Sequence, residues 1–198
     1  MNFMNKIRSI AVYCASSNQS KSSYYAEAYR LGQLAAQESI RVVYGDGGIG
    51  LMGELAKGVS SQGGEIIGVI PEFMVAEGWN NPNSTHTIQV KTMHERKSLM
   101  ESLVDGMVAL PGGIGTFEEL LECLTWKQLG LHTKPVVILN VDGYYDNLLR
   151  CLNQMIDEKL MRDIHRDMFT VVTHAEEVIP ALKNAKPWNK SIRREAAI

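Results

Sequence analysis

A glycine-rich turn stands between two regular segments, at Pro111-Gly112-Gly113-Ile114-Gly115-Thr116-Phe117-Glu118-Glu119. The apolar residues 107–110 before it predict a buried strand, and the apolar pattern of residues 117–129 predicts a helix. Such a junction presents free backbone N–H groups at the positive end of a helix dipole. The sequence therefore predicts a phosphate site here, with the carboxylate of Glu119 beside it.

The same stretch has a second interpretation, because Thr116 and Glu119 form a T-x-x-E capping box. In that case Thr116 caps the helix and Glu119 only accepts a bond from its N–H. The three glycines favour a ligand site, since a plain cap does not need them.

Residues 92–95 form a second T-x-x-E capping box, and Arg96 and Lys97 follow it directly. Cations are unfavourable near a helix N-terminus, which is the positive end of the helix dipole. A bound anion would explain both cations, and a solvated surface is the alternative.

Apolar runs alternate with amphipathic segments along the chain, which predicts an α/β domain with a doubly wound parallel sheet. We expect this single Rossmann-like domain to span residues 1–184, followed by a basic, loosely held tail at residues 185–198. Residues 71–91 are rich in Asn, Gly and Pro, and we expect a long loop without regular structure that acts as a lid. The expected strands are 7–14, 40–44, 65–70, 106–110, 135–139 and 169–173, and the expected helices are 22–37, 51–62, 93–103, 116–129, 144–159 and 175–184.

A second glycine-rich turn, residues 45–50, spells G-x-G-x-x-G between a strand and a helix. Ligands of parallel sheets bind at the carboxyl ends of strands, where this turn should meet residues 15–18 and the turn at residues 111–116. An NAD site would need an acidic residue at the far end of the next strand. Glu65 starts that strand, and Glu72 is better placed but follows Pro71. We therefore favour a general phosphate or nucleotide loop. The alternative is a tight turn that only allows close packing of the helix on the strand and binds no ligand.

The overall charge of the chain argues against several classes of partner. The 198 residues include 20 basic and 22 acidic ones, a net charge of −2, which is no footprint for nucleic acid or an anionic membrane surface. No apolar run approaches the ~20 residues of a membrane helix. The three cysteines are far apart and are expected to be reduced thiols of a cytoplasmic protein. The histidines lack metal-ligand spacing, so we expect no metal site.

Two motifs together, Met93-His94-Glu95-Arg96-Lys97 and the turn at residues 111–119, resemble the Lonely Guy (LOG) family. These proteins are cytokinin riboside 5′-monophosphate phosphoribohydrolases, many of them once labelled lysine decarboxylases. The resemblance covers residues 7–159, through Val12-Tyr13-Cys14-Ala15-Ser16-Ser17, Gly50-Leu51-Met52-Gly53, Gly68-Val69-Ile70-Pro71, Thr125-Trp126-Lys127-Gln128-Leu129-Gly130 and Asn140-Val141-Asp142-Gly143-Tyr144-Tyr145. It implies hydrolysis of a nucleoside 5′-monophosphate to free base and ribose 5-phosphate, by a homodimer that needs no cofactor.

The resemblance also implies which residues act. The catalytic pair falls on Arg96 and Glu119, and Glu77 is a looser match to a substrate contact. Together with the loops predicted from the residues themselves, the expected substrate-binding set is Ser16, Ser17, Gly45, Gly47, Gly48, Glu77, Lys97, Gly112, Gly113, Ile114, Gly115, Thr116 and Thr125. The preferred base, adenine or an N6-modified adenine, stays open.

One residue departs from the family pattern, which usually reads Tyr-Gly-Gly-Gly where this chain has Tyr44-Gly45-Asp46-Gly47. Asp46 would place a negative charge close to the phosphate or ribose, where it would bond a ribose hydroxyl or weaken phosphate binding. This residue favours the main alternative, a nucleotide-binding module without turnover. A nicotinamide-dependent oxidoreductase is a second alternative. A pyridoxal-phosphate decarboxylase has no support, because no feature singles out a Schiff-base lysine.

Overall fold

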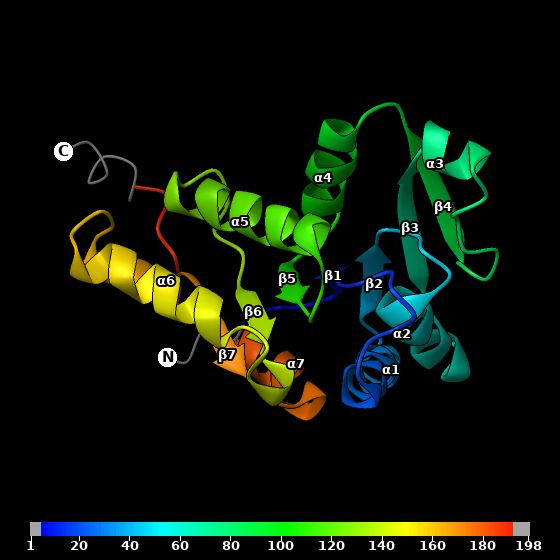
Figure 1. The fold of residues 1–198 in the computed structure, drawn as a ribbon, viewed down its shortest axis with the longest axis horizontal. Coiled ribbons are helices and arrows are strands. Elements are labelled where there is room, and N and C mark those ends of the chain that lie inside the picture. The colour runs from blue at the N-terminus through cyan, green and yellow to red at the C-terminus, as the bar shows by residue number, and fades with distance from the viewer. Residues whose placement is uncertain (1–4, 192–198) are drawn as a thin grey trace.

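The computed structural model describes residues 5–191 and contains one seven-stranded parallel sheet with helices on both faces (Figure 1). The strand order is β4-β3-β2-β1-β5-β6-β7. The predicted single α/β domain with a doubly wound, Rossmann-like sheet is confirmed. The strands are β1 Ser9–Tyr13, β2 Arg41–Tyr44, β3 Ile66–Pro71, β4 His86–Val90, β5 Gly106–Ala109, β6 Val136–Leu139 and β7 Thr170–Val172.

Helices cover both faces, and this explains why most of the strands are apolar throughout. Ile10 and Val12 of β1 face the layer of α1, α2 and α7, whereas Ala11 and Tyr13 face the layer of α4, α5 and α6. The helices are α1 Ser22–Gln37, α2 Gly50–Ser61, α3 Glu72–Ala76, α4 Met93–Ser102, α5 Ile114–Gln128, α6 Asp146–Asp157 and α7 Ala175–Asn184, with 3₁₀ segments η1 Val141–Gly143 and η2 Asp163–Met168.

The chain leaves the sheet in opposite directions after β1 and β5, which are neighbours. The loop after β1 leads to α1 on one face, and the loop after β5 leads to α5 on the other. A crevice is expected at such a switch point. The Ala15 N–H donates to Pro111 O at 3.2 Å, and the Met52 N–H donates to Ala15 O at 3.2 Å. The predicted meeting of the three loops is therefore confirmed.

Residues 71–91 correct one prediction, because they contain α3 and β4 rather than a structureless loop. Strand β4 pairs in parallel with β3 and forms an edge of the sheet, with His86, Thr87 and Gln89 exposed. An edge strand with little burial needs few apolar residues. Thr87, Ile88 and Val90 favour a strand, but the polar His86 and Gln89 and the Asn- and Pro-rich residues 80–83 before them obscured it.

Helix α5 begins at Ile114 with Gly113 as its N-cap, two residues earlier than predicted. Thr116 lies inside the first turn, so the capping-box interpretation of Thr116 and Glu119 is wrong. The other box behaves as a cap, because the Thr92 hydroxyl accepts the Glu95 N–H at 3.1 Å.

The tail is held more firmly than predicted over residues 185–191. Trp188 is buried in the core layer of α5 and α6, and its Nε1 donates to Lys127 O at 2.8 Å. The expectation of a loose tail is wrong for this part, and residues 192–198 lie outside the described residues. Between residues 5 and 191, no helix combines the length and apolar character required to span a membrane.

Candidate active site

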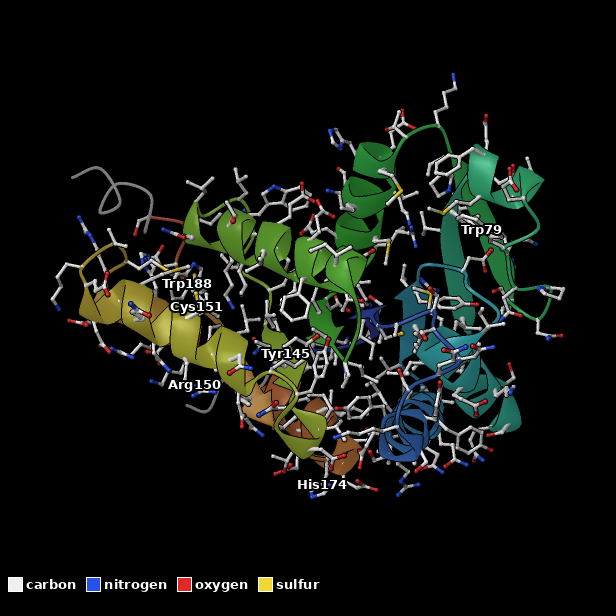
Figure 2. All side chains as sticks on the ribbon, in the orientation of Figure 1. Trp79, Tyr145, Arg150, Cys151, His174 and Trp188 are labelled. Atoms are coloured by element: carbon white, nitrogen blue, oxygen red, sulfur yellow. The ribbon has the colours of Figure 1, made fainter. Side chains whose placement is uncertain are left out.

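A cavity of about 540 Å³ opens at the carboxyl ends of β2 and β3. Arg96 brings a positive charge to it, and Ser16 and Asn80 bring neutral polar groups. One side is apolar and includes Trp79, which stands beside α3 (Figure 2). The lining residues are Ser16, Gly45, Gly47, Gly48, Ile49, Met52, Ile70, Met74, Gly78, Trp79, Asn80 and Arg96.

Helix α4 holds Arg96 against the glycine-rich loop after β2. Arg96 is 5% exposed, and its Nη2 donates to Gly45 O at 3.0 Å. A Cβ on residue 45 would lie 2.0 Å from this nitrogen, so only glycine permits the approach. The buried Nε has no hydrogen-bond partner among the described residues. A buried donor without a partner marks a place where a ligand or water is expected.

Glu119 lies in the second turn of α5 and is 8% exposed. Within residues 5–191 its carboxylate has no hydrogen-bond partner. Burial raises the pKa of Glu119 to about 7, although the positive charge of Arg96 acts to lower it. A carboxyl group that titrates near neutral pH in a buried site is typical of catalytic residues.

Lys97 joins α4 to α5. Its ammonium pairs with the carboxylates of Glu118 and Glu122, the latter at 2.9 Å. Burial lowers the pKa of Lys97, but the hydrogen bonds to both glutamates outweigh this and the pKa is raised. A protonated lysine is unsuited to Schiff-base formation. The predicted substrate contact of Lys97 stays a prediction, and a phosphate would compete there with two carboxylates.

The amides at the start of α5 are available for an anion. The first backbone bond of this helix runs from the Phe117 N–H to Gly113 O at 3.1 Å. The N–H groups of Ile114, Gly115 and Thr116 therefore have no acceptor within the helix. Residues 113–115 are exposed. This is the arrangement expected for phosphate binding at a helix N-terminus.

Two tyrosines that the sequence analysis did not single out brace this loop. The Tyr144 hydroxyl donates to Gly112 O, and the Tyr145 hydroxyl donates to Leu110 O at 2.6 Å. Tyr145 lies between α5 and α6 (Figure 2). The signal was their place in the motif at residues 140–145, but no chemistry in that motif revealed a bracing role.

Several predicted residues come together at the cavity, namely Ser16, Gly45, Gly47, Gly48 and Arg96. Ser17 is next to them and exposed, and its hydroxyl accepts the Gln19 N–H at 3.3 Å.

Other predicted residues do not line this cavity, among them Lys97, Glu119 and the turn at residues 112–116. Glu77 is exposed at the end of α3 and does not line the cavity. Thr125 is exposed on α5 and donates to Leu121 O at 2.8 Å. Glu77 and Thr125 are therefore not brought to the cavity within this chain, and the roles implied for them remain predictions. Met52, Met74 and Trp79, which line the cavity, were not predicted.

Asp46 corrects a further expectation. It is fully buried, and its carboxylate accepts the hydroxyls of Ser84 at 2.5 Å and Thr87 at 3.1 Å. It does not line the cavity. The expected placement of its charge beside the phosphate or ribose is therefore wrong, because the side chain turns toward β3 and β4 instead.

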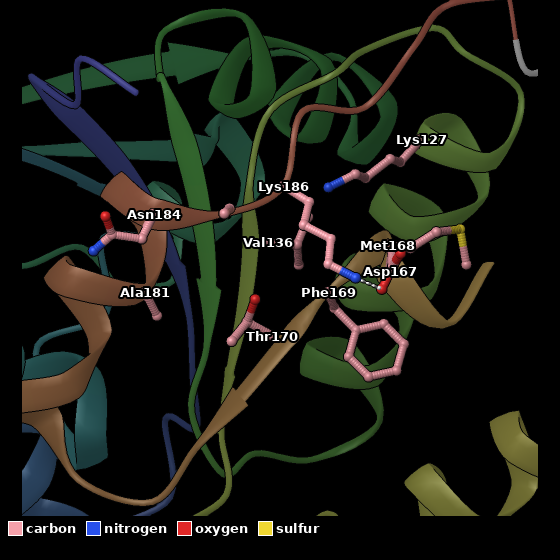
Figure 3. A pocket seen from close by; sticks show the side chains of 10 residues that line it. Lys127, Val136, Asp167, Met168, Phe169, Thr170, Ala181, Asn184 and Lys186 are labelled. Atoms are coloured by element: carbon pink, nitrogen blue, oxygen red, sulfur yellow. Dashed lines mark hydrogen bonds and ion pairs between the residues drawn. The ribbon is translucent and has the colours of Figure 1, made fainter. Parts of the chain in front are cut away.

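A second cavity of about 290 Å³ lies at the amino ends of β6 and β7 (Figure 3), and none of the predicted site residues lines it. Lys186 and Asp167 pair across it at 2.8 Å. Burial lowers the pKa of Lys127 to about 8, and its ammonium donates to Lys134 O at 2.9 Å. The cavity adjoins residues 184–186, at the end of α7.

Comparison with known proteins places the chain in a family. The family model described as "Possible lysine decarboxylase" matches residues 52–182. The chain is 39% identical over 183 residues to cytokinin riboside 5′-monophosphate phosphoribohydrolase LOG2 of Arabidopsis thaliana, covering 92% of this chain and 86% of the relative. It belongs to the LOG family. LOG3 of the same plant is also 39% identical, over 188 residues, covering 95% of this chain and 87% of LOG3.

Solved structures share the LOG fold at lower identity. A molybdenum cofactor binding protein from Rippkaea orientalis superposes with a TM-score of 0.68 at 22% identity, covering 90% of this chain and 96% of that one. The molybdenum cofactor carrier protein of Chlamydomonas reinhardtii has the same TM-score and identity, covering 91% and 98%. At this identity the likeness shows the fold alone.

Proposed function

We infer that this chain is a phosphoribohydrolase that hydrolyses the N-glycosidic bond of a nucleoside 5′-monophosphate, releasing free base and ribose 5-phosphate. The observation that carries this conclusion is Glu119, a buried carboxylate with no hydrogen-bond partner among the described residues, one turn beyond the free amides that open α5. The names of the LOG relatives support the reaction. The cavity beside Arg96 has an apolar side, which suits a planar base.

The chemistry assigns a role to each group. Glycosidic cleavage passes through a state with oxocarbenium character, which a nearby carboxylate stabilises. Ionised Glu119 faces that positive charge and orients the attacking water. The water oxygen bonds to C1′ of the ribose, the bond from C1′ to the base nitrogen breaks, and the base leaves with a proton from water. Arg96 positions Glu119 and the ribose, while the amides of residues 112–116 and the loop at residues 45–48 hold the phosphate.

The alternatives lose their supporting features. Asp46, which favoured a binding module without turnover, has its charge directed away from the cavity. Glu65, the acid considered for an NAD ribose, pairs with Arg41 at 2.8 Å just before β3. Lys97, the lysine weighed for a pyridoxal-phosphate enzyme, is held protonated by two glutamates.

A comparison of three substrates tests the proposed function. Purified protein is incubated with AMP, N6-isopentenyl-AMP and adenosine, and free base is quantified by chromatography. We expect base from both nucleotides and at least tenfold slower release from adenosine, because the amides at the start of α5 then hold no phosphate. Tight nucleotide binding in calorimetry without base release over hours would instead establish a binding module. NADH binding in a fluorescence titration, again without base release, would favour the oxidoreductase.

We also propose that the protein is a homodimer whose interface includes the outer side of α5. Ile114 and Leu121 on this helix are 89% and 40% exposed, and Leu129 at its C-cap is 45% exposed. Exposed apolar residues along one helix mark an interaction surface. Thr125 lies on the same helix and is also exposed, so it would meet substrate only in the site of a second copy.

Replacing Leu121 with Glu is expected to shift the protein from dimer to monomer, because a charge would be buried in the interface. Sedimentation velocity measures this against the chain mass of 22.0 kDa. Leu160→Glu is the matched control, since Leu160 is 72% exposed but lies after α6. A Leu121→Glu protein that still sediments as the wild type would remove α5 from the interface.

The cytoplasmic location stays a proposal. It rests on the three cysteines Cys14, Cys123 and Cys151, which are all free thiols in the structure. Thiols that persist unpaired are typical of reducing compartments. Fractionation of cells that express the protein would test the location.

A further inference from the structure

Asp46 has a backbone conformation that favours glycine. Its φ is +61°, in the left-handed region, which glycine adopts without strain and aspartate adopts less readily. Burial also raises the pKa of its carboxyl group, while hydrogen bonds from Ser84 and Thr87 lower it. Both effects oppose a buried aspartate at this position. The side chain must therefore make contacts that outweigh them.

The contacts of the Asp46 carboxylate lead to a single segment of the chain. Its two oxygens accept the hydroxyls of Ser84 at 2.5 Å and Thr87 at 3.1 Å. The carboxylate fits against Gly68 of β3, where a Cβ would lie 1.9 Å from Oδ1. Ser84 also hydrogen-bonds to the Tyr44 hydroxyl at 2.8 Å. The side chain of Asp46 thus joins the end of β2 to the residues that precede and begin β4.

Backbone contacts run in parallel with those of the side chain. The Asn81 N–H donates to Asp46 O at 2.7 Å, and Gly47 and Asn80 form an isolated antiparallel bridge. Gly78, Trp79 and Asn80 line the cavity on this side. The carboxylate contacts lie only a few residues further along the same segment. Residues 78–81, of which Gly78, Trp79 and Asn80 line the cavity, are therefore held to the glycine-rich loop through Asp46 and Gly47.

We propose that Asp46 is a positioning residue, which holds the cavity wall at residues 78–81 against the glycine-rich loop and so sets the affinity for the nucleotide. This proposal rests on the proposed function. Asp46 is adjacent to Gly45, whose carbonyl accepts the Arg96 guanidinium. The contacts of Asp46 therefore also support Gly45, the residue that accepts the Arg96 hydrogen bond. The Asp46 side chain itself stays outside the cavity and does not touch the substrate.

The variant Asp46→Gly removes the carboxylate and keeps a residue that adopts a positive φ without strain. We expect it to raise KM for the nucleotide by about tenfold with kcat within about twofold, because the wall is loosened while Glu119 is untouched. Amide hydrogen exchange over residues 79–88 is expected to accelerate in this variant. Asp46→Asn is expected to recover part of the affinity, because its amide oxygen still accepts one hydroxyl.

Two further variants make the test specific. Ser39→Gly replaces another non-glycine residue of positive φ, at +54° between α1 and β2, and is expected to change neither KM nor exchange at residues 79–88. The pair Ser84→Ala and Thr87→Val removes the partners of Asp46, so adding Asp46→Gly to it should have little further effect on KM.

The outcomes separate this proposal from the proposed function. If the wild type releases no base, the proposed function fails, and AMP affinity by calorimetry and hydrogen exchange still test the role of Asp46. An Asp46→Gly protein that melts at a changed temperature, but keeps the KM or AMP affinity and the exchange rates of residues 79–88, would overturn the positioning role.

Discussion

Glu119→Gln is expected to lower kcat by about a thousandfold or more while the protein stays folded. The amide keeps the size of the side chain but carries no negative charge to stabilise the positive ribose or orient water. The control is Glu122→Gln, one turn further along α5, because Lys97 then keeps its bond to Glu118. Base release is measured for both variants at pH 8. Equal rates for wild type and Glu119→Gln would remove Glu119 from the reaction.

The same substitution is expected to stabilise the fold at pH 8. The pKa of Glu119 is about 7 in the folded protein, above the ordinary glutamate value of 4.5. Folded protein therefore binds the proton more tightly than unfolded protein, and stability falls as pH rises from about 4.5 through 7. The ionised carboxylate destabilises the fold by about 3 kcal/mol above that range. We expect Glu119→Gln to melt roughly 6–12 °C higher at pH 8 and near the wild-type temperature at pH 4.

Activity should respond to pH in the opposite direction. If ionised Glu119 is the active form, wild-type kcat/KM rises with pH through about 7. The pH at which the enzyme becomes active is then the pH at which its fold has lost stability. This exchange of fold stability for activity is typical of a catalytic group held in a buried site. A flat profile of kcat/KM between pH 5 and 8 would contradict this role.

Arg96→Ala is expected to lower kcat/KM by about a hundredfold or more, because a buried cation that faces the substrate is lost. It should also move the acidic limb of the pH profile upward, since the charge of Arg96 lowers the pKa of Glu119. Arg96→Lys keeps the charge and loses the fork that reaches Gly45 O. We expect Arg96→Lys to keep the wild-type pH dependence on the acidic side while kcat/KM is reduced. Unchanged kinetics in Arg96→Ala would exclude Arg96 from the mechanism.

The parts of the fold that follow from local sequence could be predicted. Buried parallel strands such as β5 and β6 are continuous apolar runs, and glycines mark the turns that follow β2 and β5. Strand β4 was not predicted, because it lies at an edge of the sheet, where polar residues such as His86 and Gln89 are tolerated. The start of α5 was placed too late, because glycines give no helix signal even where they cap one.

The cavity lining was predictable where one motif supplies several neighbouring residues, as with Gly45, Gly47 and Gly48 in the glycine-rich turn after β2. What the sequence left open depends on contacts between distant segments. The direction of the Asp46 side chain is set by Ser84 and Thr87, 38 and 41 residues away. Similarly, Tyr144 braces Gly112 from 32 residues away. No local pattern encodes such pairs.

The central claim is tested most directly by quantifying both products from one reaction. A nucleoside 5′-monophosphate is incubated with wild type and with Glu119→Gln, and free base and ribose 5-phosphate are measured over time. The account predicts equal amounts of the two products from the wild type and essentially none from the variant. Base release that is undiminished in Glu119→Gln, or the absence of ribose 5-phosphate from the wild-type reaction, would contradict it.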